Sequence, residues 1–253
     1  MLSIALTEQF KSSVEWLSCR ARLANVGSTS SKTRLFDGFA VVGKALSSGR
    51  RLELLDVLAQ GPRSVERLAA EIGQGVANTS SHLQVLLGAG LVTTERDGNR
   101  VVYALASAAV EDLWAALRAT TQAHAAAVDR LAVDYLGDRS ELETITRAGL
   151  VERLRHDPRP LVLDVRPAAE FLAGHVPGAV SVPPDELATR VRRLPSADDV
   201  VAYCRGSYCI FADDAVRALR RRGRRAVRLE DGFPEWRRAG LPVAVGDETA
   251  APR

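Results

Sequence analysis

A chain of 253 residues, of which 46% are hydrophobic and 26% charged, is long enough for two globular domains that each bury a core. The formal net charge of +3 is too small to identify a nucleic-acid partner, so a DNA-binding function has to be argued from a local site. Three unevenly placed cysteines exclude a secreted disulfide framework, so a reducing cytoplasm is predicted. No segment approaches the roughly 18 apolar residues of a membrane span, so no membrane partner is predicted.

The first 136 residues show a mainly helical pattern. Residues 1–33 end in the small polar run Asn25–Ser31 and are predicted to be partly disordered, or a helix followed by a linker. Residues 34–136 form the first predicted domain, with three or four short helices, a hairpin and one long helix over residues 108–136. The chain is then interrupted at residues 137–140, where Ser140 is expected to cap a further helix.

Two helices joined by a glycine-containing turn are predicted within residues 64–88. The first is capped by Ser64 and runs to Glu71, and Gly73 and Gly75 follow it. The second helix, residues 76–88, has an apolar side made of Val76, Thr79, Leu83, Leu86 and Leu87. Its outward side carries Asn78, Ser81 and Gln84, with His82 on the flank. This pattern is typical of a helix-turn-helix.

A hairpin follows within residues 91–105, where two strand-like runs flank Asp97-Gly98. A hairpin after a helix-turn-helix makes a winged helix. The hairpin carries Arg96 and Arg100, which are placed to contact phosphates or the minor groove. A winged helix used only for protein contact is the alternative.

Residues 35–136 resemble the ArsR/SmtB family of bacterial repressors. The matching segments are Gly49–Leu58, Ser80–Leu86, Ala89–Val92 and the hairpin. The resemblance implies a homodimer on palindromic operator DNA, with Ser81, His82 and Gln84 in the major groove.

Metal sensing, which is frequent in this family, is not expected in this half of the chain. The helix before the recognition helix has no thiol, and Asp112, His124 and Asp129 are not spaced as a compact set of ligands. His124 is predicted to pack in a dimer interface instead. Cys19 stands alone, and its role is left open.

From residue 160 the pattern changes to alternating strands and helices. Short apolar runs at residues 161–165, 200–203 and 225–229 are typical of buried parallel strands, and residues 211–222 have a helical pattern. The fold class is therefore two domains: a mainly α winged helix-turn-helix, followed by an α/β parallel sheet over residues 140–245.

Cys204 and Cys209 lie in the segment between the strand at 200–203 and the next helix. A metal clip would need two more ligands that the neighbouring segments lack, so no metal or other cofactor is predicted. A thiol at this end of a parallel strand faces a helix N-terminus, where backbone N–H groups hold anions and favour the thiolate. The residues that would supply these N–H groups are Arg205, Gly206, Ser207 and Tyr208, and Arg205 would add its positive charge. A reactive Cys204 is therefore predicted, with packed, unreactive cysteines as the alternative.

The second domain resembles rhodanese. The matching segments are Leu161–Phe171, Gly174–Ala179 and Glu230–Val243. The resemblance implies that Cys204 accepts sulfane sulfur from a donor such as thiosulfate or a persulfide, and that the loop N–H groups and Arg205 stabilise the bound anion. Ile210 stands where related phosphatases need an arginine, which argues against phosphatase chemistry.

The second loop thiol departs from what thiosulfate transfer needs. Cys209 could attack a persulfide on Cys204 and leave a disulfide. The leading hypothesis is a dimeric repressor that responds to reactive sulfur, and the alternative is a thiosulfate or persulfide sulfurtransferase with an accessory winged helix. Metalloid binding by the two cysteines is a third hypothesis. The nearby side chains expected to be structural are Asp164, Arg166, Glu170, His175 and Trp236.

Overall fold

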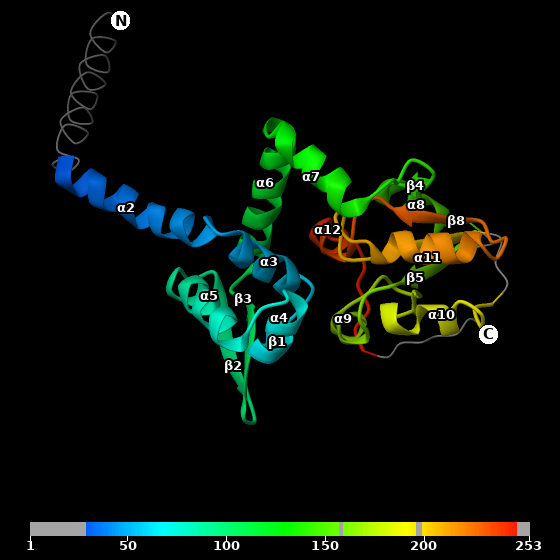
Figure 1. Cartoon of the computed structure of the whole chain (residues 1–253), viewed down its shortest axis with the longest axis horizontal. Coiled ribbons are helices and arrows are strands. Elements are labelled where there is room, and N and C mark those ends of the chain that lie inside the picture. The colour runs from blue at the N-terminus through cyan, green and yellow to red at the C-terminus, as the bar shows by residue number, and fades with distance from the viewer. Residues whose placement is uncertain (1–28, 157–158, 196–198, 247–253) are drawn as a thin grey trace, which may run out of the picture. The chain divides into compact units, whose positions relative to one another are not determined.

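The computed structural model describes residues 29–156, 159–195 and 199–246, and the chain divides into two compact units between Gly49 and Arg50. In the first unit, α2 (Thr29–Leu46) is a helix of 18 residues (Figure 1). Because this helix begins at Thr29, residues 29–33 are helical and not a linker. The rest of the predicted extension, including Cys19, lies outside the described residues.

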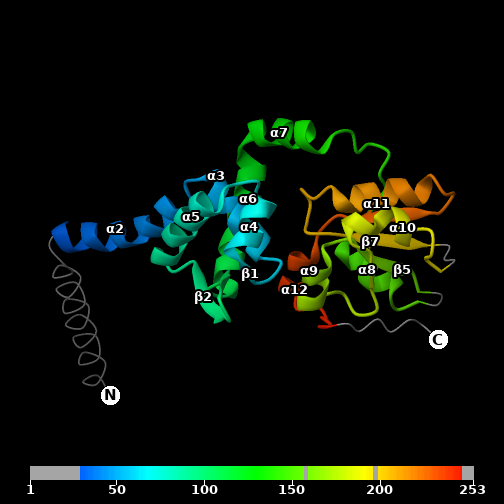
Figure 2. The same cartoon turned by 60° about the horizontal axis from the view of Figure 1, so that its bottom comes forward.

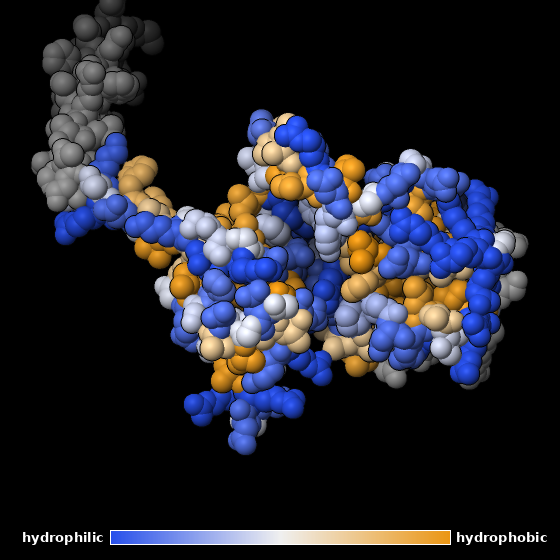
Figure 3. Space-filling model, viewed as in Figure 1, coloured by the Kyte–Doolittle hydropathy of each residue, from blue (hydrophilic) through white to orange (hydrophobic). Residues whose placement is uncertain are grey.

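Helix α2 has an exposed apolar side. Figure 3 shows apolar surface along this helix, to which Leu35, Phe36, Phe39 and Val41 contribute. Phe36 and Phe39 meet edge to face with 5.9 Å between their ring centroids. Exposed apolar side chains in this number are suited to contact with another protein surface.

The second unit begins with the predicted winged helix. Its elements are α3 (Gly49–Leu58), β1 (Arg63–Ser64), α4 (Val65–Glu71), α5 (Val76–Gly88), β2 (Val92–Asp97) and β3 (Arg100–Leu105). The three strands form an antiparallel sheet in the order β1-β3-β2, in which Arg63 pairs with Tyr103. The helix-turn-helix and the hairpin are confirmed, whereas the two-residue strand β1 was not predicted.

The prediction of one long helix over residues 108–136 is wrong in one respect. It is divided into α6 (Ala108–His124) and α7 (Ala126–Leu136), since Ala125 has φ −113° and ψ 80°, outside the helical range. His124 at the end of α6 is exposed in the single chain, and its place in a dimer interface stays a prediction.

The expected cap at Ser140 is also wrong. The Ser140 N–H donates to Asp138 Oδ1 at 2.8 Å, which makes a local turn instead of a helix start. The next helix, α8 (Arg147–Arg153), is capped by Thr146, whose hydroxyl accepts from the Gly149 N–H at 3.1 Å.

The remaining residues form a parallel five-stranded sheet in the order β4-β8-β7-β5-β6. The strands are β4 (Thr144–Ile145), β5 (Leu161–Asp164), β6 (Val180–Ser181), β7 (Val200–Tyr203) and β8 (Ala226–Leu229). Every residue of β7 and β8 is buried, as expected of strands covered on both faces. The three predicted strands are confirmed, and β4 and β6 are too short to give a pattern.

Helices cover both faces of this sheet. They are α8, α9 (Ala168–Ala173), η1 (Pro184–Glu186), α10 (Leu187–Arg190), α11 (Phe211–Arg220) and α12 (Phe233–Arg238). Figure 2 shows α10 and α11 on one face and α8 and α9 on the other. Two separate apolar clusters fill the spaces: one lies under α11, the other under α8, α9 and α12. Among the described helices, none has the length and apolar character needed to cross a bilayer.

Candidate functional site

The loop Cys204–Ile210 leads from the end of β7 to the start of α11. Its first turn is fixed from behind, because the Phe233 N–H donates to the Cys204 carbonyl at 3.1 Å. A Cβ at Gly232 would lie 2.3 Å from the loop backbone at Arg205 and Gly206, so only glycine allows this close approach. Gly206 has φ +146°, a conformation that other residues rarely adopt.

Cys204 is almost completely buried, with 1% of its surface exposed. Its Sγ lies 3.8 Å from the Gly206 carbonyl oxygen and 3.7 Å from that of Cys209. Burial raises the pKa of the Cys204 thiol well above its usual value, and its S–H hydrogen bond to the Cys209 sulfur adds to this. Backbone N–H groups of Gly206 and Ala212 act in the opposite direction but are outweighed. The expectation that Cys204 is the thiolate is therefore wrong for this state of the loop.

Cys209 is the more acidic thiol of the pair. The S–H of Cys204 donates to the Cys209 sulfur and lowers the pKa of Cys209 despite partial burial, with smaller contributions from the Arg205 and Phe211 N–H groups. The backbone amides that were expected to serve Cys204 are thus divided between two sulfur atoms. Both cysteines are free, and Cys209 is the one that is partly exposed.

Alkylation should therefore be faster at Cys209 than at Cys204 at neutral pH. Because only the thiolate reacts, the rate at Cys209 should reach its plateau at a lower pH than the rate of an ordinary cysteine. Peptide mass spectrometry after timed treatment with iodoacetamide, repeated across pH, measures both sites in one sample. In Cys209→Ser, Cys204 should stay slow; faster labelling of Cys204 than of Cys209 in the wild type would contradict this assignment.

Arg205 has carboxylate partners. Its guanidinium forms ion pairs with Glu170 and, at 2.5 Å, with Glu71 of α4. Burial works to lower the pKa of Arg205, but the two carboxylates together raise it above its usual value. Both carboxylates also pair with Arg63, and the contribution of Arg205 to anion binding stays a prediction.

The far end of the loop is held by Arg139, which follows α7. Arg139 donates to the carbonyl oxygens of Ser207 at 2.7 Å and Cys209 at 2.9 Å, and its Nε lies 2.5 Å from the fully buried Asp213. Tyr208 accepts a hydrogen bond from Gln122 of α6 at 2.8 Å. No sequence pattern pointed to Arg139 or Gln122, since only the tertiary fold brings them to the loop.

A pocket of about 180 Å³ opens beside the loop. It is lined by Asp56, Arg118, Tyr135, Arg205, Gly206, Tyr208, Cys209, Ile210 and Phe211. Cys209 reaches this pocket and Cys204 does not. A molecule that enters it meets side chains from α3, α6 and α7 as well as the loop.

The charged residues at the end of β5 support the fold. Asp164 and Arg166 are fully buried and paired at 2.6 Å, and Tyr203 donates its hydroxyl to Asp164 at 2.6 Å. His175 is buried and stacked on Phe171 at 3.7 Å between ring centroids. The expected structural roles of Asp164, Arg166 and His175 are confirmed, and Trp236, 2% exposed, lies in the core.

The predicted DNA-contact residues lie on α5 and the wing. Asn78, Ser81 and Gln84 are exposed and His82 is half-buried, whereas Thr79, Leu83 and Leu86 on the opposite side are fully buried. Val76 was expected on the apolar side but is 47% exposed. Arg96 and Arg100 are exposed in the hairpin, whose tip is hydrophilic in Figure 3. Their contact with DNA stays a prediction.

Comparison with protein families gives two matches. The model described as "Bacterial regulatory protein, arsR family" matches residues 48–94, and the model of the rhodanese-like domain matches residues 147–239. The HTH-type transcriptional regulator Rv0324 of Mycobacterium tuberculosis is 46% identical over 220 residues, which cover 87% of this chain and 96% of that protein.

Each half also has relatives of its own. A sulfurtransferase of Allochromatium vinosum is 32% identical over 101 residues, 40% of this chain and 94% of that protein. A solved homodimeric winged helix-turn-helix DNA-binding domain from Mycobacterium bovis, a possible ArsR-family regulator, is 41% identical and covers 40% of this chain and 93% of its own, with a TM-score of 0.37.

Proposed function

Because the chain belongs to the ArsR family of bacterial transcriptional regulators and carries a C-terminal rhodanese-like domain, we propose that it is a homodimeric repressor whose affinity for operator DNA depends on the sulfur state of Cys204. The observation that carries this proposal is the pair of contacting thiols in a loop that the winged helix itself touches through Glu71 and Gln122. A sulfur-handling loop in contact with a DNA-binding domain is suited to signalling.

The first chemical step transfers one sulfur atom. The thiolate of Cys204 attacks the outer sulfur of a persulfide R–S–SH, the S–S bond of the donor breaks, and R–SH leaves with the proton. Cys204 then carries a persulfide. Because burial raises the pKa of Cys204, its thiolate forms once the loop opens to a donor, and the proton that Cys204 gives up is the one that the leaving R–S⁻ takes.

The second step makes the modification reversible. The thiolate of Cys209 attacks the inner sulfur of the persulfide, a disulfide between Cys204 and Cys209 forms, and sulfide leaves. A cellular dithiol would return the loop to its starting state. This assignment gives the second thiol a function that plain thiosulfate transfer does not need.

The alternative is a sulfurtransferase with an accessory winged helix, which is favoured by the similarity of the second half to a sulfurtransferase along 94% of that protein. In that case sulfur would pass repeatedly from thiosulfate to an acceptor such as cyanide. Turnover far beyond one equivalent of donor, with unchanged DNA affinity, would favour the enzyme over the regulator.

Treatment with a persulfide donor should change the affinity for operator DNA by about 5–150-fold, the usual range of allosteric coupling. Operator duplexes would first be selected from random-sequence DNA with reduced and with donor-treated protein. Fluorescence anisotropy then gives the Kd in both states, and intact-protein mass spectrometry reports the added sulfur.

In Cys204→Ser the sulfur uptake at the loop and the change in affinity should both disappear, while reduced-state binding stays as in the wild type. Cys209→Ser should still take up sulfur but form no loop disulfide. Equal DNA affinity in wild type and Cys204→Ser, with and without donor, would overturn the regulatory proposal.

A further inference from the structure

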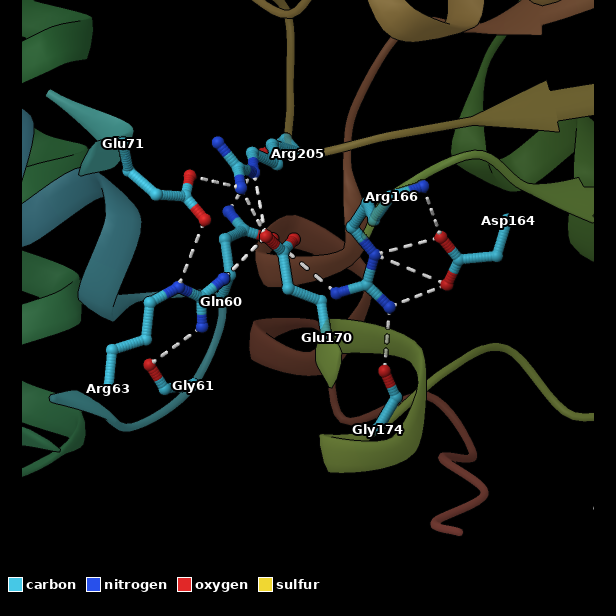
Figure 4. A network of polar contacts seen from close by, with 9 residues as sticks. All are labelled: Gln60, Gly61, Arg63, Glu71, Asp164, Arg166, Glu170, Gly174 and Arg205. Carbon is cyan, nitrogen blue, oxygen red and sulfur yellow. Dashed lines mark hydrogen bonds and ion pairs between the residues drawn. The ribbon is translucent and has the colours of Figure 1, made fainter. Parts of the chain in front are cut away.

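Four charged side chains around the loop form a closed ring of ion pairs. In this charge ring, made of Arg63, Glu71, Glu170 and Arg205, each carboxylate contacts both guanidinium groups (Figure 4). Arg63 lies 2.5 Å from Glu170 and 3.4 Å from Glu71. The ring has no net charge, and Glu170 within it is fully buried.

The charge ring joins the loop to both DNA-binding elements. Arg205 follows Cys204 directly. Glu71 is the last residue of α4 and lies four residues before Gly75, the N-cap of α5. Arg63 lies in β1, which pairs with wing strand β3 at Tyr103. Only two of the four side chains belong to the rhodanese-like domain, so the ring spans the two domains within one compact unit.

Gln60 provides a second connection beside the ring. Its Nε2 donates to the carbonyl oxygen of Arg205 at 3.2 Å, and its Oε1 accepts from Arg166 at 3.4 Å. Gln60 is only 1% exposed, so these contacts are shielded from water. Both the side chain and the backbone of Arg205 are therefore bound by residues of the winged helix.

A persulfide on Cys204 does not fit this arrangement. Sγ of Cys204 lies near two carbonyl oxygens, which repel an anion, as well as near the backbone N–H groups of Gly206 and Ala212, and the residue is only 1% exposed. The added outer sulfur is charged at neutral pH and needs room that the closed loop does not leave, so the loop has to turn its carbonyl groups away from it. Because Gly232 and Phe233 block the rear of the loop, the movement involves Arg205 and Gly206 on the open side.

Movement of Arg205 has a large effect on its partners. Glu170 Oε2 has no hydrogen-bond partner among the described residues, so this carboxylate depends on its ion pairs. A buried carboxylate that loses a guanidinium has to regain one or be exposed. Arg63, already 2.5 Å from Glu170, is its remaining guanidinium partner, while Glu71 at the end of α4 keeps only its longer contact of 3.4 Å with Arg63.

We infer that the charge ring transmits the sulfur state of Cys204 to α4 and β1, with Arg205 as the positioning residue. This inference rests on the proposed function of the loop and adds the route of its signal. The ring is complete when Cys204 is a thiol and is broken at Arg205 when Cys204 carries a sulfur. The orientation of α5 and the wing, and hence DNA affinity, follows the ring.

The test is Glu71→Gln in the full-length chain, which keeps the shape of the side chain and removes its charge from the ring. Sulfur uptake at Cys204 should proceed as in the wild type, because Glu71 does not touch either thiol. The ratio of the operator Kd values in the two sulfur states should fall from about 5–150 to near one. Glu53→Gln is the matched control: it removes one exposed charge from α3 and should keep the wild-type ratio.

Arg63→Lys breaks the ring from the other side without changing the charge, because an ammonium cannot contact two carboxylates as the guanidinium does. It should also lower the ratio, and it carries the test if Glu71→Gln does not fold. A wild-type ratio in the folded variants, with sulfur uptake intact, would overturn the charge ring as the route. Absence of sulfur uptake or of any DNA response in the wild type would instead overturn the proposed function.

Discussion

Replacement of Arg166 by methionine should lower the free energy of unfolding by about 3–5 kcal/mol, the usual effect of removing one partner of a buried ion pair. Asp164 would keep its charge in a fully buried position with the Tyr203 hydroxyl and the backbone N–H of residue 166 as its remaining donors. The substitution also removes a hydrogen bond to the Gly174 carbonyl at 2.6 Å and the contact of the guanidinium with Phe233. Chemical denaturation followed by circular dichroism measures the loss.

Two further variants make this prediction specific. Arg155→Met removes an exposed ion pair with Glu152 and should cost at most about 1 kcal/mol. The double variant Asp164→Asn/Arg166→Met buries no charge and should recover part of the stability lost in Arg166→Met. If Arg166→Met and Arg155→Met were equally stable, the bracing role of the Asp164–Arg166 pair would be refuted.

Removal of both wing arginines, Arg96→Ala with Arg100→Ala, should weaken binding to every DNA sequence and flatten its dependence on salt. Each lost phosphate contact should reduce the slope of log K against log salt by about 0.9. Both side chains are exposed, so the fold should be unaffected. Titration of labelled DNA at several salt concentrations gives the slope.

Gln84→Ala is the informative comparison for the wing variant. If Gln84 contacts a base, its removal should weaken binding to the preferred sequence by about 1–3 kcal/mol and relax the preference at one position. The salt slope should stay the same. An unchanged salt slope in the wing variant would mean that Arg96 and Arg100 do not contact phosphates.

The sequence predicted the elements whose patterns are local. The alternating faces of α5, the Asp97-Gly98 hairpin and the apolar runs of β5 and β7 follow from side-chain periodicity, and the structure has them at the predicted places. The break at Ala125 has no such signal, because alanine-rich sequence on both sides favours helix. The two-residue strands β4 and β6 are too short for a period to be recognised.

The candidate site was predicted in composition but not in its electrostatics. Chain position showed that Cys204 ends a strand, but the depth of its burial depends on packing from α11, and this reverses the expected order of acidity of the two thiols. Likewise, no local pattern pairs Arg205 with Glu71, which are 134 residues apart in the chain. Long-range partners of charged side chains become visible only in the folded chain.

The hydrogen bonds from Arg139 to the loop carbonyl oxygens have a consequence for truncated forms of this protein. A fragment that starts at residue 140, where sequence patterns place the beginning of the second domain, lacks the guanidinium that closes the carboxyl end of the loop. Thiol reactivities measured on such a fragment would describe a looser loop than that of the intact protein. The segment between the two domains that contains Arg139 is thus needed for the structure of the loop, and a truncation designed to isolate the rhodanese-like domain should retain it.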